Sequence, residues 1–250
     1  MKNKLIFEFS KNKTDGDSSL NNLLGGKGAN LAEMSNMKIP VPPGFTITTE
    51  VCNYFTENNK LPDNLDNEIR KAVKNLESLS DKSFGGEGTP LLLSVRSGAR
   101  VSMPGMMDSV LNIGLNDSNV FQLAEAFNDE RFALDSYRRL IQMYSNVVLG
   151  VEHERFEAVL ANKKRMDNVV SDADFNVDQL NWIINAYKNT VERFTDSLFP
   201  QEPYEQLTGA IEAVFNSWQN KRAVIYRKIN NIPDSWGTGA TIQSMVFGNL

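Results

Sequence analysis

The 250-residue sequence contains one cysteine, one histidine and no long apolar run. A lone cysteine, Cys52, forms no internal disulfide, which favours a cytoplasmic location. No stretch approaches the roughly 18 consecutive apolar residues that cross a bilayer, so we expect no membrane partner. The 26 Lys and Arg residues against 31 Asp and Glu residues give a net charge of −5. This balance argues against the basic stripe typical of proteins that bind nucleic acid.

The scarcity of histidine and cysteine also limits the chemistry. His153 stands in a charged helical stretch, where a surface histidine is the ordinary interpretation. A zinc site would have too few ligands, and a serine protease-like triad would have to recruit this one residue. Any catalysis must therefore depend on lysine, arginine and carboxylates, which suits phosphoryl transfer by charge stabilisation.

Hydrophobic patterning predicts an α/β (α+β) body interrupted by a helical insertion. Short apolar runs bounded by breakers predict strands, and three- or four-residue apolar spacing predicts helices. From about 119 to 196 breakers are almost absent, and helical spacing dominates. One long helix is then expected to carry Leu207 to Ile229. The predicted strands are at 5–9, 45–47, 91–95 and 241–247, and predicted helices in the first third are at 29–34, 51–55 and 63–79.

A glycine cluster, Gly25-Gly26-Lys27-Gly28, precedes the first of these helices. Backbone N–H groups at a helix start attract anions, and Lys27 adds a full charge. The spacing matches neither a Walker P-loop nor a dinucleotide fingerprint. Without further context, a flexible turn is the more ordinary interpretation of this cluster.

Two arginines and two hydroxyl groups follow a predicted buried strand, in the segment 94–100. Gly98 allows a close backbone approach, and the arginine side chains match phosphate oxygens in pairs. Strand ends are also the usual ligand edge of α/β sheets. The alternative is a solvated loop with surface arginines. Three methionines next to Pro104-Gly105 follow, and these are unusual as core filler in a loop.

At this point the sequence resembles the pyruvate, phosphate dikinase family over essentially its whole length. The resemblance implies the first subdomain of an ATP-grasp fold, formed by residues 1–115 and 200–250, with a helical insertion subdomain at 116–199. The matching motifs are residues 23–34, 41–49, 94–108, 135–139 and 243–249.

This family converts ATP, phosphate and pyruvate to AMP, pyrophosphate and phosphoenolpyruvate with Mg²⁺. The resemblance implies that Lys27 and Arg96 contact the ATP phosphates and stabilise charge during transfer. It further implies a methionine loop over the nucleotide, and backbone groups of 243–247 that read the adenine. The implied cofactor-binding residues are Gly26, Gly28, Ser97, Gly98, Met103, Gly105, Met106, Met107, Gln243, Met245, Val246 and Phe247.

One departure from the family bears on function. The Thr-Ser-His-Ala-like motif of the carrier histidine is absent, and His153 has none of its context. The second ATP lobe, the Mg²⁺ ligands, the phosphohistidine domain and the pyruvate-binding barrel are therefore expected outside this chain. The resemblance implies that they belong to a longer, homodimeric enzyme and that the isolated chain is inactive. Two alternatives stay open: the N-terminal region of phosphoenolpyruvate synthase, and a non-catalytic module that keeps the fold.

Overall fold

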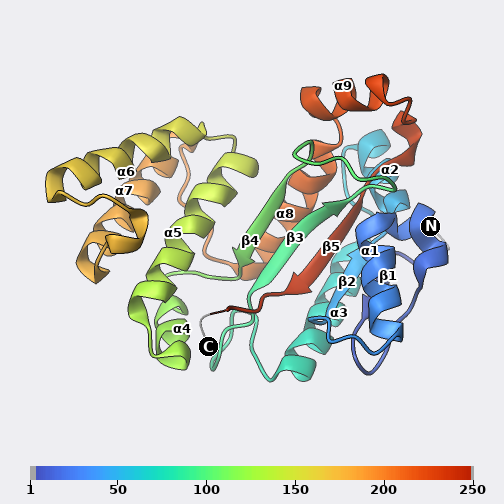
Figure 1. Cartoon of the computed structure of the whole chain (residues 1–250), viewed down its shortest axis with the longest axis horizontal. Coiled ribbons are helices and arrows are strands. Elements are labelled where there is room, and N and C mark those ends of the chain that lie inside the picture. The colour runs from blue at the N-terminus through green and yellow to red at the C-terminus, as the bar shows by residue number, and fades with distance from the viewer. Residues whose placement is uncertain (1–3, 249–250) are drawn as a thin grey trace.

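The computed structural model describes residues 4–248, which form a mixed α/β fold around one antiparallel sheet (Figure 1). The strands lie in the order β1-β2-β5-β3-β4, and every neighbouring pair is antiparallel. The last strand in the chain is therefore the central one. The strands are β1 (Ile6–Phe9), β2 (Gly44–Ile47), β3 (Leu93–Gly98), β4 (Ser109–Ile113) and β5 (Gly239–Ser244).

Helices cover both faces of this sheet. Helix α1 crosses one face and contacts β1, β2, β3 and β5, whereas α8 lies behind β3, β4 and β5 (Figure 1). The helices are α1 (Asn21–Asn36), α2 (Thr49–Asn58), α3 (Leu65–Ser80), α4 (Val120–Phe127), α5 (Glu130–Val147), α6 (His153–Asp167), α7 (Val177–Thr195), α8 (Pro203–Ser217) and α9 (Lys221–Ile229). Single 3₁₀ turns are η1 (Ser18–Leu20), η2 (Asp172–Asp174) and η3 (Asp234–Trp236).

The sheet face beneath α1 is polar and closely packed. Thr46 of β2 and Thr241 of β5 are buried there, with their hydroxyl oxygens 3.4 Å apart. A Cβ atom on Gly28 of α1 would lie 2.7 Å from the Thr46 Oγ1 atom. Because successive side chains alternate across a strand, the neighbouring Phe45 and Ile242 face the other side and enter the apolar core. Gly28 thus allows α1 to lie close to the sheet.

Most of the predicted strands are confirmed, but the end of the chain differs from the prediction. The strand expected at 241–247 runs from Gly239 to Ser244 and is buried along its whole length, so it shows no alternation of exposure. Its pairing with β2 on one side and β3 on the other explains this burial. Strand β4 was not predicted, and it follows directly after the methionine loop.

The long helix expected from Leu207 to Ile229 is wrong, because α8 and α9 are separate helices. Trp218 is almost completely buried at the break, where its indole N–H donates to the Asp234 carbonyl at 3.0 Å. The buried Arg227 side chain donates to the Trp218 carbonyl, which removes that acceptor from a continuous helix. Tertiary contacts at one aromatic residue therefore divide the helical pattern.

Helices α4 to α7 pack on one another and on the edge of the sheet. Helix α5 contacts β4 as well as α4, α7 and α8. The buried residues of these helices join those of the sheet in one continuous hydrophobic core. The division into residues 116–199 and the rest stays a prediction, because the packing alone does not define a second domain.

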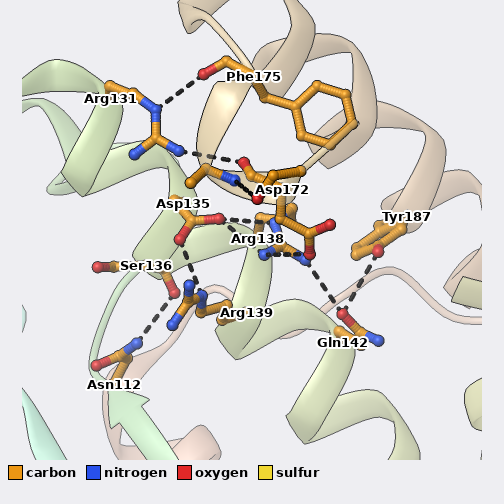
Figure 2. Close-up of polar contacts among 12 residues, drawn as sticks. Asn112, Arg131, Asp135, Ser136, Arg138, Arg139, Gln142, Asp172, Phe175 and Tyr187 are labelled. Atoms are coloured by element: carbon orange, nitrogen blue, oxygen red, sulfur yellow. Dashed lines mark hydrogen bonds and ion pairs between the residues drawn. The ribbon is translucent and has the colours of Figure 1, made fainter. Parts of the chain in front are cut away.

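The motif at 135–139 lies on α5 and supports this packing. Arg138 is nearly fully buried and donates from Nε and Nη2 to the Asp135 Oδ1 atom at 2.9 and 2.8 Å (Figure 2). The Asp172 carboxylate approaches the same guanidinium at 3.7 Å, while Arg139 pairs with the other Asp135 oxygen at 2.8 Å. On the sheet side, Asn112 of β4 donates to the Ser136 carbonyl at 3.1 Å. The motif therefore connects β4, α5 and η2.

Replacing Asp135 with asparagine is expected to destabilise the fold by about 2 kcal/mol, because the buried Arg138 loses its main counter-charge. The loss is smaller than for a fully isolated charge because Asp172 remains nearby. Urea unfolding followed by circular dichroism measures the change. The matched control is Glu152→Gln, which removes the exposed partner of Arg155 and is expected to cost below about 1 kcal/mol. Equal losses in the two variants would contradict a special role for the buried pair.

Candidate anion-binding site

A cavity of about 750 Å³ lies between α1 and the loop that joins β3 to β4. Lys27 enters it from α1, and Arg96 enters it from β3. Arg100 follows in the connecting loop. The complete lining is Asn21, Gly26, Lys27, Asn30, Leu31, Met34, Arg96, Ser97, Gly98, Ala99, Arg100, Val101, Ser102, Met103, Pro104, Gly105, Met107 and Ser109.

A sharp kink at Gly25 brings these two segments together. Gly25 has φ +68° and ψ 166° inside the span of α1, a conformation that is essentially restricted to glycine. A Cβ atom there would lie 1.6 Å from the Gly98 carbonyl oxygen. The next residue, Gly26, donates its N–H to the Ala99 carbonyl at 2.8 Å. The start of the helix is therefore bonded to the loop after β3, and Lys27 is placed over that loop.

The ammonium group of Lys27 is half-buried and faces the end of β3. Its Nζ atom donates to the Ser97 carbonyl at 2.7 Å. Burial lowers the pKa of Lys27 from its ordinary value of 10.5, and the positive charge of Arg96 lowers it further. No carboxylate pairs with Lys27 within residues 4–248, so the folded protein holds this charge uncompensated.

Arg96 is oriented by a neighbouring strand. The Nη2 atom of Arg96 donates to the Gln243 side-chain oxygen, and the Gln243 side-chain amide nitrogen donates to the Pro42 carbonyl at 2.9 Å. The Nε atom of Arg96 is buried without a partner. Burial also lowers the pKa of Arg96. Gln243 therefore positions the guanidinium and leaves part of its donor capacity unused.

Eight of the residues predicted from the sequence line this cavity together. They are Gly26, Lys27, Arg96, Ser97, Gly98, Met103, Gly105 and Met107. The Ser97-Gly98 segment does lie at the end of its strand, but the sheet is antiparallel throughout, so the rule for parallel α/β sheets is not the reason.

The other predicted residues lie outside the cavity lining. Gly28 packs against Thr46, and Met106 packs against the core from a partly buried position. The segment after Gln243 turns away towards α4 and α5, where the Phe247 ring contacts Phe127 and Phe132 with centroids 5.5 and 4.9 Å away. Met245 and Val246 lie between, and Val246 is exposed. Asn249, the last residue of the closing motif, is outside the described residues.

Arg100, Asn21 and Asn30 were missed as site residues. Asn21 donates from its side chain to the Arg100 carbonyl at 3.2 Å, which adds a second connection between α1 and the loop. Asn30 stands three residues after Lys27 in α1, so helical spacing could have placed both on one face. Arg100 could have been found from the sequence, because it is the second of two arginines in the segment 94–100.

The methionine loop is anchored at its far end by α9. Asp108 pairs with the Arg222 guanidinium and accepts from the Asn220 side chain at 2.9 Å. Arg222 also donates from Nε to the Met106 carbonyl at 3.1 Å. These contacts fix the loop where it leaves the cavity, so that Met103, Gly105 and Met107 remain along one wall.

The charge of the lining favours an anionic ligand. Lys27, Arg96 and Arg100 supply three positive charges, and no Asp or Glu is present among the described lining residues. A second cavity of similar size, between α5, α8 and α9, is different because Asp108 and Glu212 there balance Lys221 and Arg222. Partly desolvated cations without counter-charges are the usual environment for phosphate groups.

Metal and membrane features are absent from the region that the structure covers. Residues 4–248 contain no group of three or more His, Cys, Asp or Glu side chains arranged to hold a metal ion. None of the described helices is sufficiently long and apolar to cross a bilayer.

Comparisons with known proteins identify the relatives of this chain. The family model described as pyruvate phosphate dikinase, AMP/ATP-binding domain, matches residues 21–84 and 60–250. The chain is 51% identical over 248 residues to pyruvate, phosphate dikinase of Rickettsia conorii, covering 99% of this chain and 28% of that protein. It is 47% identical to the Clostridium symbiosum protein of that name, covering 98% and 28%. It is 46% identical to the chloroplastic protein of Mesembryanthemum crystallinum, covering 99% and 26%.

Proposed function

Because the chain belongs to the AMP/ATP-binding-domain family of pyruvate phosphate dikinase, we propose that its cationic cavity binds the phosphate chain of ATP. The observation that carries the proposal is the set of Lys27, Arg96 and Arg100 around one cavity with no carboxylate in the described lining. Family membership selects a nucleotide from among the anions that such a site accepts.

Lys27 and Arg96 have the chemistry for this role. The Lys27 ammonium is half-buried next to a backbone carbonyl, and the Arg96 Nε atom is buried and unpartnered. Both pKa values are lowered by burial, so each cation gains from an incoming anion. A phosphate oxygen between the two would neutralise their mutual repulsion. In the transfer step, the same charges would stabilise the negative charge on the phosphoryl group.

The wider reaction is also a proposal, because the chain spans about 28% of the length of the bacterial relatives. We propose that it is the nucleotide-binding part of an enzyme that converts ATP, phosphate and pyruvate to AMP, pyrophosphate and phosphoenolpyruvate. His153 begins α6, is largely exposed, lies 3.4 Å from the Glu157 carboxylate, and is not among the residues that line the cavity. The acceptor histidine is therefore assigned outside these residues.

The roles expected for the methionine loop, for 243–247 and for Mg²⁺ differ in how much support their positions give. The methionine loop forms one wall of the cavity, which supports contact with the nucleotide. Recognition of adenine by 243–247 stays a prediction, since only Gln243 touches the site, through Arg96. The described cavity offers no carboxylate for Mg²⁺, so no step is assigned to the metal here.

Titration calorimetry with ATP, AMP and inorganic tripolyphosphate tests the phosphate assignment. We expect the chain to bind ATP and tripolyphosphate and to bind AMP much more weakly, because AMP has one phosphate group for three cations. Arg96→Gln should weaken the first two ligands. Equal affinity for AMP and ATP, or no binding of any of the three, would contradict the proposal.

Lys27 should also make binding depend on pH. Its pKa lies below the ordinary 10.5 in the free protein, and a bound anion raises that pKa again. The protonated form therefore binds the anion more tightly, and affinity for tripolyphosphate should fall as the pH rises through the lowered pKa. In that window, below 10.5, binding should take up a proton. Calorimetry in two buffers of different ionisation enthalpy measures the uptake, and a Lys27→Met variant that takes up the same proton would exclude Lys27 as its source.

A further inference from the structure

Arg100 differs from the other two cations of the cavity in how it is held. Its guanidinium lies over the Trp236 ring, 5.2 Å from the ring centroid. Its Nε atom is buried without a hydrogen-bond partner. Across the described part of the chain, the Arg100 side chain has no carboxylate partner. An aromatic face is thus the main contact of a partly buried cation.

The other described arginines that stack on aromatic rings either have a carboxylate partner or are exposed to water. Arg70 lies 4.2 Å from the centroid of Tyr204 and pairs with Asp66 at 2.9 Å. Arg227, on Trp218, pairs with Asp234 at 2.7 Å. Arg155, on Phe194, pairs with Glu152, and Arg193 on the same ring is exposed to water. Arg100 is partly buried, lies on an aromatic ring and has no carboxylate partner among the described residues. This combination indicates that the anion it pairs with is a ligand.

The platform itself is fixed by the scaffold. Trp236 ends η3, and the preceding carbonyl of Ser235 accepts from the Asn53 side chain of α2 at 2.9 Å. After Trp236, the Thr238 hydroxyl accepts from the Gly98 N–H at 3.1 Å. The chain on the two sides of Trp236 is therefore bonded to α2 and to Gly98 at the end of β3, and Gly98 lines the cavity. The Arg100 side chain, with no polar contact, is free to turn towards the cavity.

We propose that Arg100 is a third phosphate-binding residue, which exchanges its contact with the Trp236 ring for a phosphate group when a polyphosphate binds. This inference rests on the proposed function, and it deepens that function by adding a ligand at the loop side of the cavity. A charge-assisted hydrogen bond to phosphate is stronger than a cation–π contact of a partly exposed arginine, so the exchange is favourable.

Tripolyphosphate and ATP, each titrated into the purified chain, test the role of the charge. Arg100→Gln should weaken binding of both ligands about tenfold, the loss expected for one charge-assisted contact. The affinity of Arg100→Lys should lie between those of the unaltered chain and Arg100→Gln, because lysine keeps the charge but loses the forked donors of arginine. Arg70→Gln is the matched control, a ring-stacked arginine outside the cavity, and should bind as the unaltered chain does.

Tryptophan fluorescence tests the movement. Ligand binding should change the emission of the unaltered chain, because the cation leaves the Trp236 ring, and this change should be lost in Trp236→Phe and in Arg100→Gln. The affinity of Trp236→Phe for both ligands should equal or slightly exceed that of the unaltered chain. If the Arg100–Trp236 pair were merely structural, Trp236→Phe would bind the ligands more weakly.

The outcomes separate the inference from the function on which it depends. If Arg96→Gln loses affinity and Arg100→Gln does not, the role of Arg100 is refuted and the phosphate site stands. If the unaltered chain binds neither tripolyphosphate nor ATP, the proposed function itself fails. Weaker binding by Arg100→Gln together with the loss of the Trp236 signal supports the inference.

Discussion

Replacing Lys27 with methionine should weaken binding of ATP about a hundredfold, equivalent to about 3 kcal/mol. In the enzyme to which the proposed function assigns this chain, the same change should slow phosphoryl transfer by a similar factor. The reason is local. The Lys27 ammonium is one of three cations in the cavity and is partly removed from water, so its interaction with phosphate is weakly screened. Calorimetry on this chain and turnover by the full-length enzyme measure the two losses separately.

Loss of folding should not explain this result. The lowered pKa means that the folded protein disfavours the charge on Lys27, so this group costs stability at neutral pH and the cost declines as the pH rises towards 10.5. Methionine removes that cost and keeps the apolar stem, so the midpoint temperature of thermal unfolding should be unchanged or higher. Lys71→Met, at an exposed position on α3, is the matched control and should leave ATP binding unaltered. Unchanged turnover by Lys27→Met would remove Lys27 from the site.

Gly25→Ala should have the largest effect on stability, about 4 kcal/mol. Alanine at φ +68° and ψ 166° has a strained backbone, which accounts for roughly 1–3 kcal/mol. The new Cβ would also collide with the Gly98 carbonyl oxygen, and relief requires the kink and the end of β3 to separate, at a further 1–3 kcal/mol. Chemical denaturation gives the free energy of unfolding directly.

The control separates backbone strain from collision. Gly88 has φ +94°, but a Cβ atom there would meet nothing within 4 Å. Gly88→Ala should therefore cost only about 1 kcal/mol. We further expect any Gly25→Ala protein that folds to bind tripolyphosphate weakly, since the same separation moves Lys27 away from Arg96. Similar losses of stability in the two variants would show that the approach of α1 to β3 is not tight.

The sequence was most informative where one local pattern determines the structure. Ala133, Tyr137 and Leu140 share a buried face of α5 because helical spacing alone places them together. Strand β4 was not predicted, because no proline or glycine separates it from the preceding methionine loop. The division of α8 from α9 could not be predicted, because it depends on hydrogen bonds of Trp218 and Arg227 to residues 16 and 9 positions away, which helical spacing does not connect.

The site followed the same logic. Motifs indicated which residues occur together, and Lys27 and Arg96 do share one cavity. A motif does not state which way each residue faces, and Gly28 and Gln243 lie beside the cavity as a packing contact and an arginine support. Arg100 was passed over because its significance depends on Trp236, 136 positions later in the numbering, which no local pattern connects to it.

The central position of β5 has a consequence for the order of folding. Gly44 of β2 pairs with Gln243, and Leu93 of β3 pairs with Ser244, so the sheet closes only through contacts between distant parts of the chain. Closure of such long loops is slow, and until then β2 and β3 each present an unpaired edge that is prone to aggregation. Arg96 acquires its Gln243 support in the same event. Competence to bind polyphosphate should therefore be the last property gained during refolding, and it distinguishes a completed sheet from a collapsed intermediate with native helices.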